Sequence, residues 1–94
     1  MDIKIENNKS AKRFEAIAAG YRVFIDYELN NQTMTLIHTK VPSELEGQGL
    51  GGKIVKAALE YAKNHGLQVI PQCPFVLSYI ERHQEYKTLI ENEH

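Results

Sequence analysis

The chain has 94 residues, of which 43% are hydrophobic and 24% charged, and its formal net charge is −1. This length and composition predict one soluble globular domain spanning residues 1–94. The near-neutral charge argues against a nucleic-acid-binding protein, because binding to a phosphate backbone requires a basic excess or a basic face.

Membrane, secretory and metal-binding classes are disfavoured as well. Residues 1–6 lack the apolar core of a signal peptide, and no segment is long enough to span a bilayer, which predicts a cytoplasmic protein without a membrane partner. The single cysteine, Cys73, cannot form an internal disulfide, and with the four histidines it makes no zinc-ligand spacing. We therefore expect a reduced thiol and no bound metal.

The first half of the chain has the alternating pattern of an antiparallel strand meander. Phe14, Ala16 and Ala18 alternate with Glu15 and Ile17, which predicts a strand with one better-buried face. Three antiparallel strands are predicted before the helix, at residues 13–18, 21–29 and 33–41, with turns at 19–20 and 30–31. A short first strand at 3–6 and a turn at 7–10 are possible additions.

The second half predicts a helix, a strand and short C-terminal helices. Apolar residues at helical spacing indicate a helix over 53–65, and Gly66 suits its left-handed C-terminal cap. A strand at 67–70 follows after a connection of helical length, so a parallel crossover beside the third strand of the meander is the economical topology. A second helix is expected after Pro74 and a further helical turn at 86–90. The predicted fold class is α/β (α+β).

The segment 46–52, which we call the glycine loop, has the sequence Glu-Gly-Gln-Gly-Leu-Gly-Gly and contains four of the six glycines. Glycines allow a ligand to approach the backbone, and a helix start offers unpaired N–H groups with about half a positive charge. These features predict binding of a phosphate or diphosphate.

Two common phosphate-binding motifs fit the loop poorly. A P-loop requires Ser or Thr where this chain has Ile54, and no later strand ends in an Asp for magnesium. A dinucleotide-binding GxGxxG motif requires a buried strand leading directly into the glycines, but residues 42–46 intervene, and the next strand ends in Pro-Gln-Cys rather than in an acidic residue.

The loop resembles that of the GNAT superfamily of acyl-CoA-dependent N-acetyltransferases, whose pattern is Gln/Arg-x-x-Gly-x-Gly/Ala. Gly49 and Gly51 fill the glycine positions, and Glu46 stands where the family usually has Gln or Arg. The flanking motifs are similar to those of the small single-domain YjdJ-type branch of this superfamily. They comprise Val41-Pro42 before the loop and Pro71-x-Cys73-Pro74-Phe75, Tyr79 and His83-x-Glu85-Tyr86 after it.

This resemblance implies a coenzyme site between two strands that separate at their ends, residues 36–40 and 67–72. The backbone of residues 39–41 would hold the pantetheine arm, and the glycine loop would hold the diphosphate. The predicted coenzyme-binding residues are Thr39, Lys40, Val41, Gly47, Gln48, Gly49, Leu50, Gly51 and Gly52.

Three side chains are candidates for catalysis beside this site. His38 is of a type that takes a proton near neutral pH, although a strand histidine with a purely structural role is an equal alternative. Cys73 precedes a helix start, which can lower a thiol pKa, and the alternative is a small buried apolar residue. Tyr79 falls where larger members of the family place a tyrosine that protonates the departing thiolate, but tyrosine at this spacing is more often part of a core.

The sequence therefore predicts an acetyl-CoA-dependent N-acetyltransferase that acts on a small or peptidic amine. Two routes are open: direct attack by an amine deprotonated by His38 or water, or a relay through acetyl-Cys73. The alternative from another class is a non-catalytic acyl-CoA-binding or interaction module, because the chain is short for the superfamily. A monomer or weak homodimer is expected.

Overall fold

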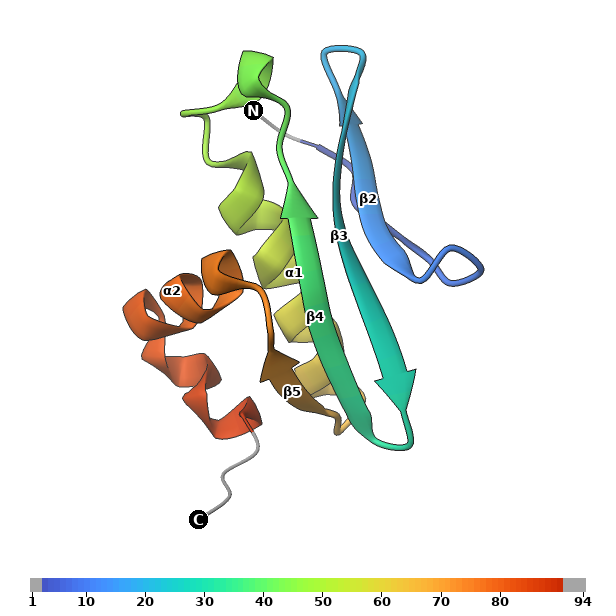
Figure 1. The fold of residues 1–94 in the computed structure, drawn as a ribbon, viewed down its shortest axis with the longest axis vertical. Coiled ribbons are helices and arrows are strands. Elements are labelled where there is room, and N and C mark those ends of the chain that lie inside the picture. The colour runs from blue at the N-terminus through green and yellow to red at the C-terminus, as the bar shows by residue number, and fades with distance from the viewer. Residues whose placement is uncertain (1–2, 91–94) are drawn as a thin grey trace.

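The computed structural model describes residues 3–90, which form one five-stranded sheet with helices packed against it (Figure 1). The strands are neighbours in chain order, the first four antiparallel and the last parallel to the fourth. They are β1 (Glu6–Asn8), β2 (Arg13–Ala18), β3 (Tyr21–Asn30), β4 (Thr33–Lys40) and β5 (Gln68–Pro71). The helical elements are η1 (Ser43–Leu45), α1 (Leu50–Asn64), α2 (Pro74–Arg82) and η2 (Gln84–Leu89).

The main strands confirm the predicted meander, and the N-terminal strand corrects it. β1 covers residues 6–8 rather than 3–6, so four antiparallel strands precede α1 and the predicted turn at 7–10 is wrong in its first two residues. Asn7 pairs with Phe14, and its side-chain oxygen accepts a hydrogen bond of 2.6 Å from the Tyr27 hydroxyl. These contacts outweigh the turn preference of asparagine, which is a local property.

One face of the sheet forms the core with α1, which contacts β2, β3, β4 and β5. As predicted, Phe14, Ala16 and Ala18 are buried while Ile17 is 59% exposed. Ile54, Ala58 and Ala62 are fully buried on α1. Removing this apolar surface from water is the main force that holds the helix on the sheet.

α1 begins at Leu50, three residues earlier than predicted, and ends at Asn64. Two residues of the glycine loop, Gly51 and Gly52, therefore lie in the first helical turn. Their low helix propensity had argued against this position. Gly66 has a φ of +67°, which confirms the left-handed conformation expected after this helix. The chain then returns as β5 beside β4, so the predicted parallel crossover is confirmed.

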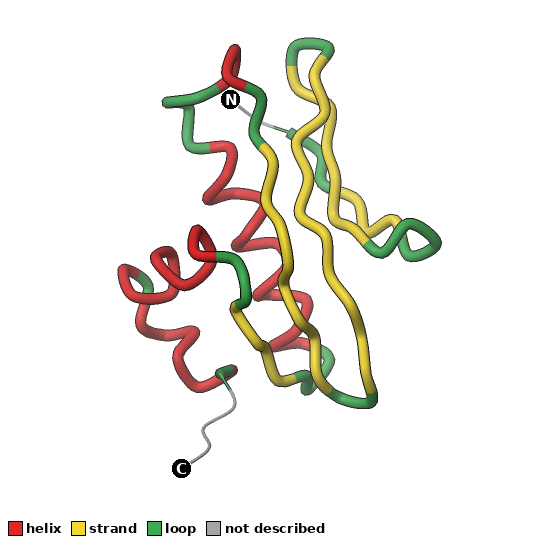
Figure 2. Tube along the Cα trace, in the orientation of Figure 1, coloured by secondary structure: helices red, strands yellow, loops and turns green. Residues whose placement is uncertain are grey.

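β4 and β5 pair over only half the length of β4. Their parallel pairing runs from Thr33 with Gln68 to Leu36 with Pro71, and the backbone N–H of Cys73 then donates to the carbonyl oxygen of Leu36 at 3.1 Å. A bulge follows in β4, because Ile37 is an extra residue in its pairing with β3. Beyond it, β4 runs on towards the loop while the chain after β5 turns away into α2, as Figure 2 shows.

α2 covers the region where β4 and β5 separate, and η2 packs on α1 and α2. α2 begins at Pro74 as predicted and contacts α1, β4 and β5, while η2 begins at Gln84, two residues earlier than the predicted turn. The buried Tyr86 donates a hydrogen bond from its hydroxyl to Glu60 and so ties η2 to α1. Within residues 3–90, no helix is both long and apolar enough to cross a membrane.

Candidate active site

The start of α1 presents unpaired backbone N–H groups. Gly49 occupies the N-cap position with a φ of +75°, a left-handed conformation that glycine adopts without a steric cost. The first helical hydrogen bond runs from the N–H of Lys53 to the carbonyl oxygen of Gly49 at 3.2 Å, and no side chain caps the helix. Within residues 3–90, the N–H groups of Leu50, Gly51 and Gly52 have no protein acceptor. These donors, at the positive end of a 15-residue helix, suit an anionic ligand.

Glycine is required at position 51 because neighbouring side chains lie close to it, and not because its backbone conformation is unusual. A Cβ atom at this position would lie 2.7 Å from Cζ of Phe75 and 3.3 Å from Cγ2 of Val41. The absence of a side chain therefore lets the first residues of α2 and the end of β4 meet the start of α1. The three segments become the walls of one site.

A cleft of about 410 Å³ opens between these walls. Half of its lining residues were predicted as coenzyme-binding: Val41, Gly47, Gly49, Leu50, Gly51 and Gly52. The predicted catalytic Tyr79 also lines it. The remaining lining residues come from the end of η1, from the glycine loop, from α2 and from the residue that caps α2. They were not predicted as site residues: Leu45, Glu46, Phe75, Arg82 and His83.

Cys73 lies at the N-cap position of α2, just beyond the last pairing of β4 with β5. It is 7% exposed, and its Sγ atom is 3.6 Å from Oγ1 of Thr39. Burial alone would raise the pKa of the Cys73 thiol, but hydrogen bonds from the Thr39 hydroxyl and from the N–H groups of Val76 and Phe75 outweigh it. The pKa of Cys73 is therefore below its ordinary value, which favours the nucleophilic thiolate.

We expect Thr39→Val to raise the pKa of the Cys73 thiol. Valine keeps the shape of threonine but has no hydroxyl to stabilise the thiolate, so a larger fraction of the thiol stays protonated at neutral pH. The rate of Cys73 alkylation by iodoacetamide, measured from acid to alkaline pH, should show its midpoint at higher pH in the variant. Thr35→Val, a change on the part of β4 that pairs with β5, is the control. An unchanged midpoint in Thr39→Val would contradict the hydrogen bond.

The structure brings Thr39 and Cys73 together but places His38 on the other face of β4. Thr39 pairs with the buried Ile25, whereas His38 pairs with Asp26, and paired residues share a face of the sheet. The exposed His38 ring lies 6.2 Å from that of Phe24, centroid to centroid. A role for His38 as the base stays a prediction that depends on an acceptor bound on that face.

Tyr79 lies in the wall of the cleft, 7% exposed and stacked on His83 with ring centroids 4.0 Å apart. The ring of His83 is also held by Nδ1, which is 3.0 Å from the carbonyl oxygen of Tyr79. Burial, followed by the negative charge of Glu85, raises the pKa of the Tyr79 phenol above its ordinary value. The phenol therefore keeps its proton, as a proton donor at this position would require.

Thr39, Lys40 and Gln48 were predicted to bind the coenzyme but do not line the cleft. Thr39 contacts Cys73, which does not line the cleft either, while Lys40 and Gln48 are exposed. The sequence contained a signal for the α2 wall that was not used. Phe75, Tyr79 and Arg82 are spaced by four and three residues, which places them on one side of a helix that starts at Pro74.

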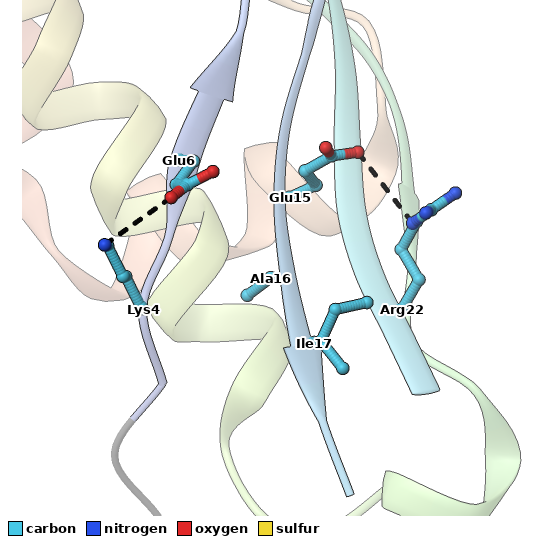
Figure 3. Close-up of a pocket in the computed structure, with 6 residues that line it drawn as sticks. All are labelled: Lys4, Glu6, Glu15, Ala16, Ile17 and Arg22. Atoms are coloured by element: carbon cyan, nitrogen blue, oxygen red, sulfur yellow. Dashed lines mark ion pairs between the residues drawn. The ribbon is translucent and has the colours of Figure 1, made fainter. Parts of the chain in front are cut away.

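A second hollow, of about 250 Å³, lies beside β1, β2 and β3 (Figure 3). Its charged side chains form two ion pairs, Lys4 with Glu6 at 3.7 Å and Arg22 with Glu15 at 3.9 Å. The pairs leave little net charge there for a ligand, and this hollow shares no residue with the cleft. No group of three or more His, Cys, Asp or Glu side chains that could hold a metal ion is found among residues 3–90.

The fold is an α/β fold of the N-acetyltransferase type. It has a free helix start in a glycine loop, two strands that separate, and a thiol beyond the end of their pairing. Comparison with known proteins identifies the family directly. The chain belongs to the GCN5-related N-acetyltransferase family, whose model matches residues 13–89. The resemblance to the GNAT superfamily, the fold class and the assignment as an acyltransferase are confirmed, while the YjdJ-type branch stays a prediction.

The relatives are small proteins of similar length. Protein NATD1 of Xenopus tropicalis is 26% identical over 82 residues, covering 84% of this chain and 75% of that protein. Protein NATD1 of Mus musculus is also 26% identical, over 84% of this chain and 74% of its own. The solution structure of a GCN5-like protein from Staphylococcus aureus superposes with a TM-score of 0.72 at 27% identity, covering 99% of this chain and 90% of that one.

Proposed function

We propose that this protein transfers an acetyl group from acetyl-CoA to a small or peptidic amine. The observation that carries the proposal is the set of unpaired N–H groups at the start of α1, which line the cleft next to the separated ends of β4 and β5. A diphosphate on these N–H groups directs the rest of the coenzyme along Val41 towards Thr39 and Cys73.

The coenzyme supplies an activated thioester when bound, and the residues of the chain supply the rest. The Cys73 thiolate, stabilised by Thr39 and by the N–H groups at the start of α2, attacks the thioester carbonyl carbon and takes the acetyl group. Tyr79 donates its phenolic proton to the departing thiolate. An unprotonated amine then attacks the acetyl carbon and takes the acetyl group from Cys73. The proton that the amine loses returns to the Tyr79 phenolate, and the Cys73 thiolate is restored. Direct attack of the amine on acetyl-CoA is the alternative route.

The test begins with the ligand. Calorimetric titrations with acetyl-CoA, CoA and ATP are run side by side. Acetyl-CoA and CoA should bind, whereas ATP should bind weakly both with and without magnesium. Incubation with acetyl-CoA and no amine should add one acetyl group to the protein by mass spectrometry, and peptide mapping should locate it on Cys73. Failure to bind either coenzyme form would overturn the proposal. The expected cytoplasmic location and the monomeric or weakly dimeric state stay predictions.

A further inference from the structure

The charges around the cleft are distributed unevenly between the glycine loop and α2. The wall formed by the glycine loop has backbone donors but no cationic side chain among the lining residues, and its one charged member, Glu46, is an anion. A diphosphate bound there would meet this carboxylate as well as the helix start. Like charges at close range disfavour binding unless a cation compensates for them.

Arg82 on α2 is the one lysine or arginine that lines the cleft among residues 3–90. It lies seven residues after Phe75 and three after Tyr79, so it continues the stripe of α2 residues that faces the glycine loop. Its Nη1 atom donates a hydrogen bond of 2.9 Å to the hydroxyl of Ser78, one helical turn earlier. This bond restrains the long side chain and leaves the charge of the guanidinium unneutralised.

No carboxylate forms an ion pair with Arg82 among the described residues. Arg13 and Arg22, by contrast, each pair with an acidic side chain. Arginine at the C-terminal end of a helix has a simpler explanation, because a cation there stabilises the helix dipole. That role requires only a positive charge near the last turn. Arg82 in addition lines the same cleft as the residues with free backbone donors, Leu50, Gly51 and Gly52.

We infer that Arg82 binds the diphosphate of coenzyme A from the α2 wall and supplies the cation that the glycine loop lacks. The inference rests on the proposed function. The planar guanidinium offers several N–H donors in one fork, which match two oxygens of a phosphate better than a lysine ammonium does. The coenzyme would then be held between two elements, α1 by its backbone and α2 by this side chain. Its binding would fix α2, which carries Cys73 at one end and Tyr79 in the middle.

The test compares Arg82→Gln with wild type in titrations with CoA, 3′-dephospho-CoA and pantetheine. We expect the dissociation constants of CoA and dephospho-CoA to rise by about tenfold or more, and by the same factor, because a charge-assisted contact to the diphosphate is lost in both. The factor should shrink at high salt, since Arg82 is exposed and its charge is screened. Arg82→Lys should show an intermediate loss, because it keeps the charge without the fork.

Two controls separate this contact from other effects. Arg22→Gln makes the same change in net charge at the second hollow, and it should leave CoA binding unchanged if the effect of Arg82 is local (Figure 3). Thermal unfolding of each variant reports a loss of helix stability. Acetyl transfer gives a further comparison, with the short thioester S-acetyl-N-acetylcysteamine, which has no phosphate. The ratio of kcat/KM for acetyl-CoA to kcat/KM for this thioester should fall in Arg82→Gln by the factor seen in binding.

Several results would overturn the inference. Binding of CoA to Arg82→Gln with wild-type affinity would show that the guanidinium makes no contact. A loss seen with CoA but not with dephospho-CoA would assign Arg82 to the 3′-phosphate instead of the diphosphate. Either result leaves the proposed function standing, whereas failure of the wild-type protein itself to bind CoA would remove the proposed function.

Discussion

Replacement of Cys73 by Ala is expected to reduce acetyl transfer by about 10²-fold or more, because the covalent route loses its nucleophile. The side chain is small and buried, so the substitution removes the sulfur with a modest loss of packing. Binding of acetyl-CoA should change little, because the phosphate-binding groups lie at the start of α1. Steady-state rates at saturating amine, together with a calorimetric dissociation constant, measure the two effects separately.

The pH dependence of the acetylation rate tests the role of Cys73 in a second way. Because the pKa of Cys73 is below the ordinary thiol value, the rate of its acetylation should persist towards lower pH than an unperturbed thiol would allow, and fall only as the thiolate is protonated. The matched control is Leu77→Ala, on an exposed position of α2 that does not line the cleft, which should keep wild-type turnover to within about twofold. Wild-type turnover in Cys73→Ala would exclude the relay and favour direct attack by the amine.

Gly51→Ala is expected to weaken CoA binding by about tenfold or more without unfolding the protein. The new methyl group would lie 2.7 Å from Cζ of Phe75, so the ring must move, and the wall of the cleft moves with it. Alanine is the better helix former by up to about 1 kcal/mol, and Gly51 has no positive φ, so the helix itself is not strained. Calorimetry and thermal unfolding together distinguish a blocked site from an unstable fold.

Gly20→Ala is the matched control for this substitution. Gly20 lies in the turn between β2 and β3 with a φ of +82°, and no atom lies within 4 Å of the position that a Cβ atom would take, so alanine there costs stability through its backbone alone. Its CoA affinity should be that of the wild type. If the clash with Phe75 is the cause, Phe75→Ala in the Gly51→Ala background should restore part of the lost affinity. Unchanged CoA binding in Gly51→Ala would contradict the close approach of α2 to the loop.

Much of this site was predictable because its signals are local. The alternation of apolar and polar residues in the first half, the glycines, the helical periodicity after them and the Cys-Pro dipeptide each report on a few neighbouring residues. These signals predicted the strand meander, the phosphate-binding helix start and the thiol at the N-terminus of a second helix. The element limits were less certain. α1 starts within the glycine loop itself, because the burial of Leu50 in the core and the close contact of Gly51 with Phe75 outweigh the low helix propensity of Gly51 and Gly52.

The sequence by itself determined the α/β class, the family and the identity of the loop, since these depend on spacing along the chain. Only the tertiary structure decided which side chains share a surface. It placed Thr39 against Cys73, turned His38 to the opposite face of β4 through the bulge at Ile37, and put Arg82 in the wall of the cleft that the loop also lines. The physical reason is that one extra residue in a strand reverses which faces its side chains occupy, and that the packing of α2 on α1 depends on contacts between residues far apart in the sequence.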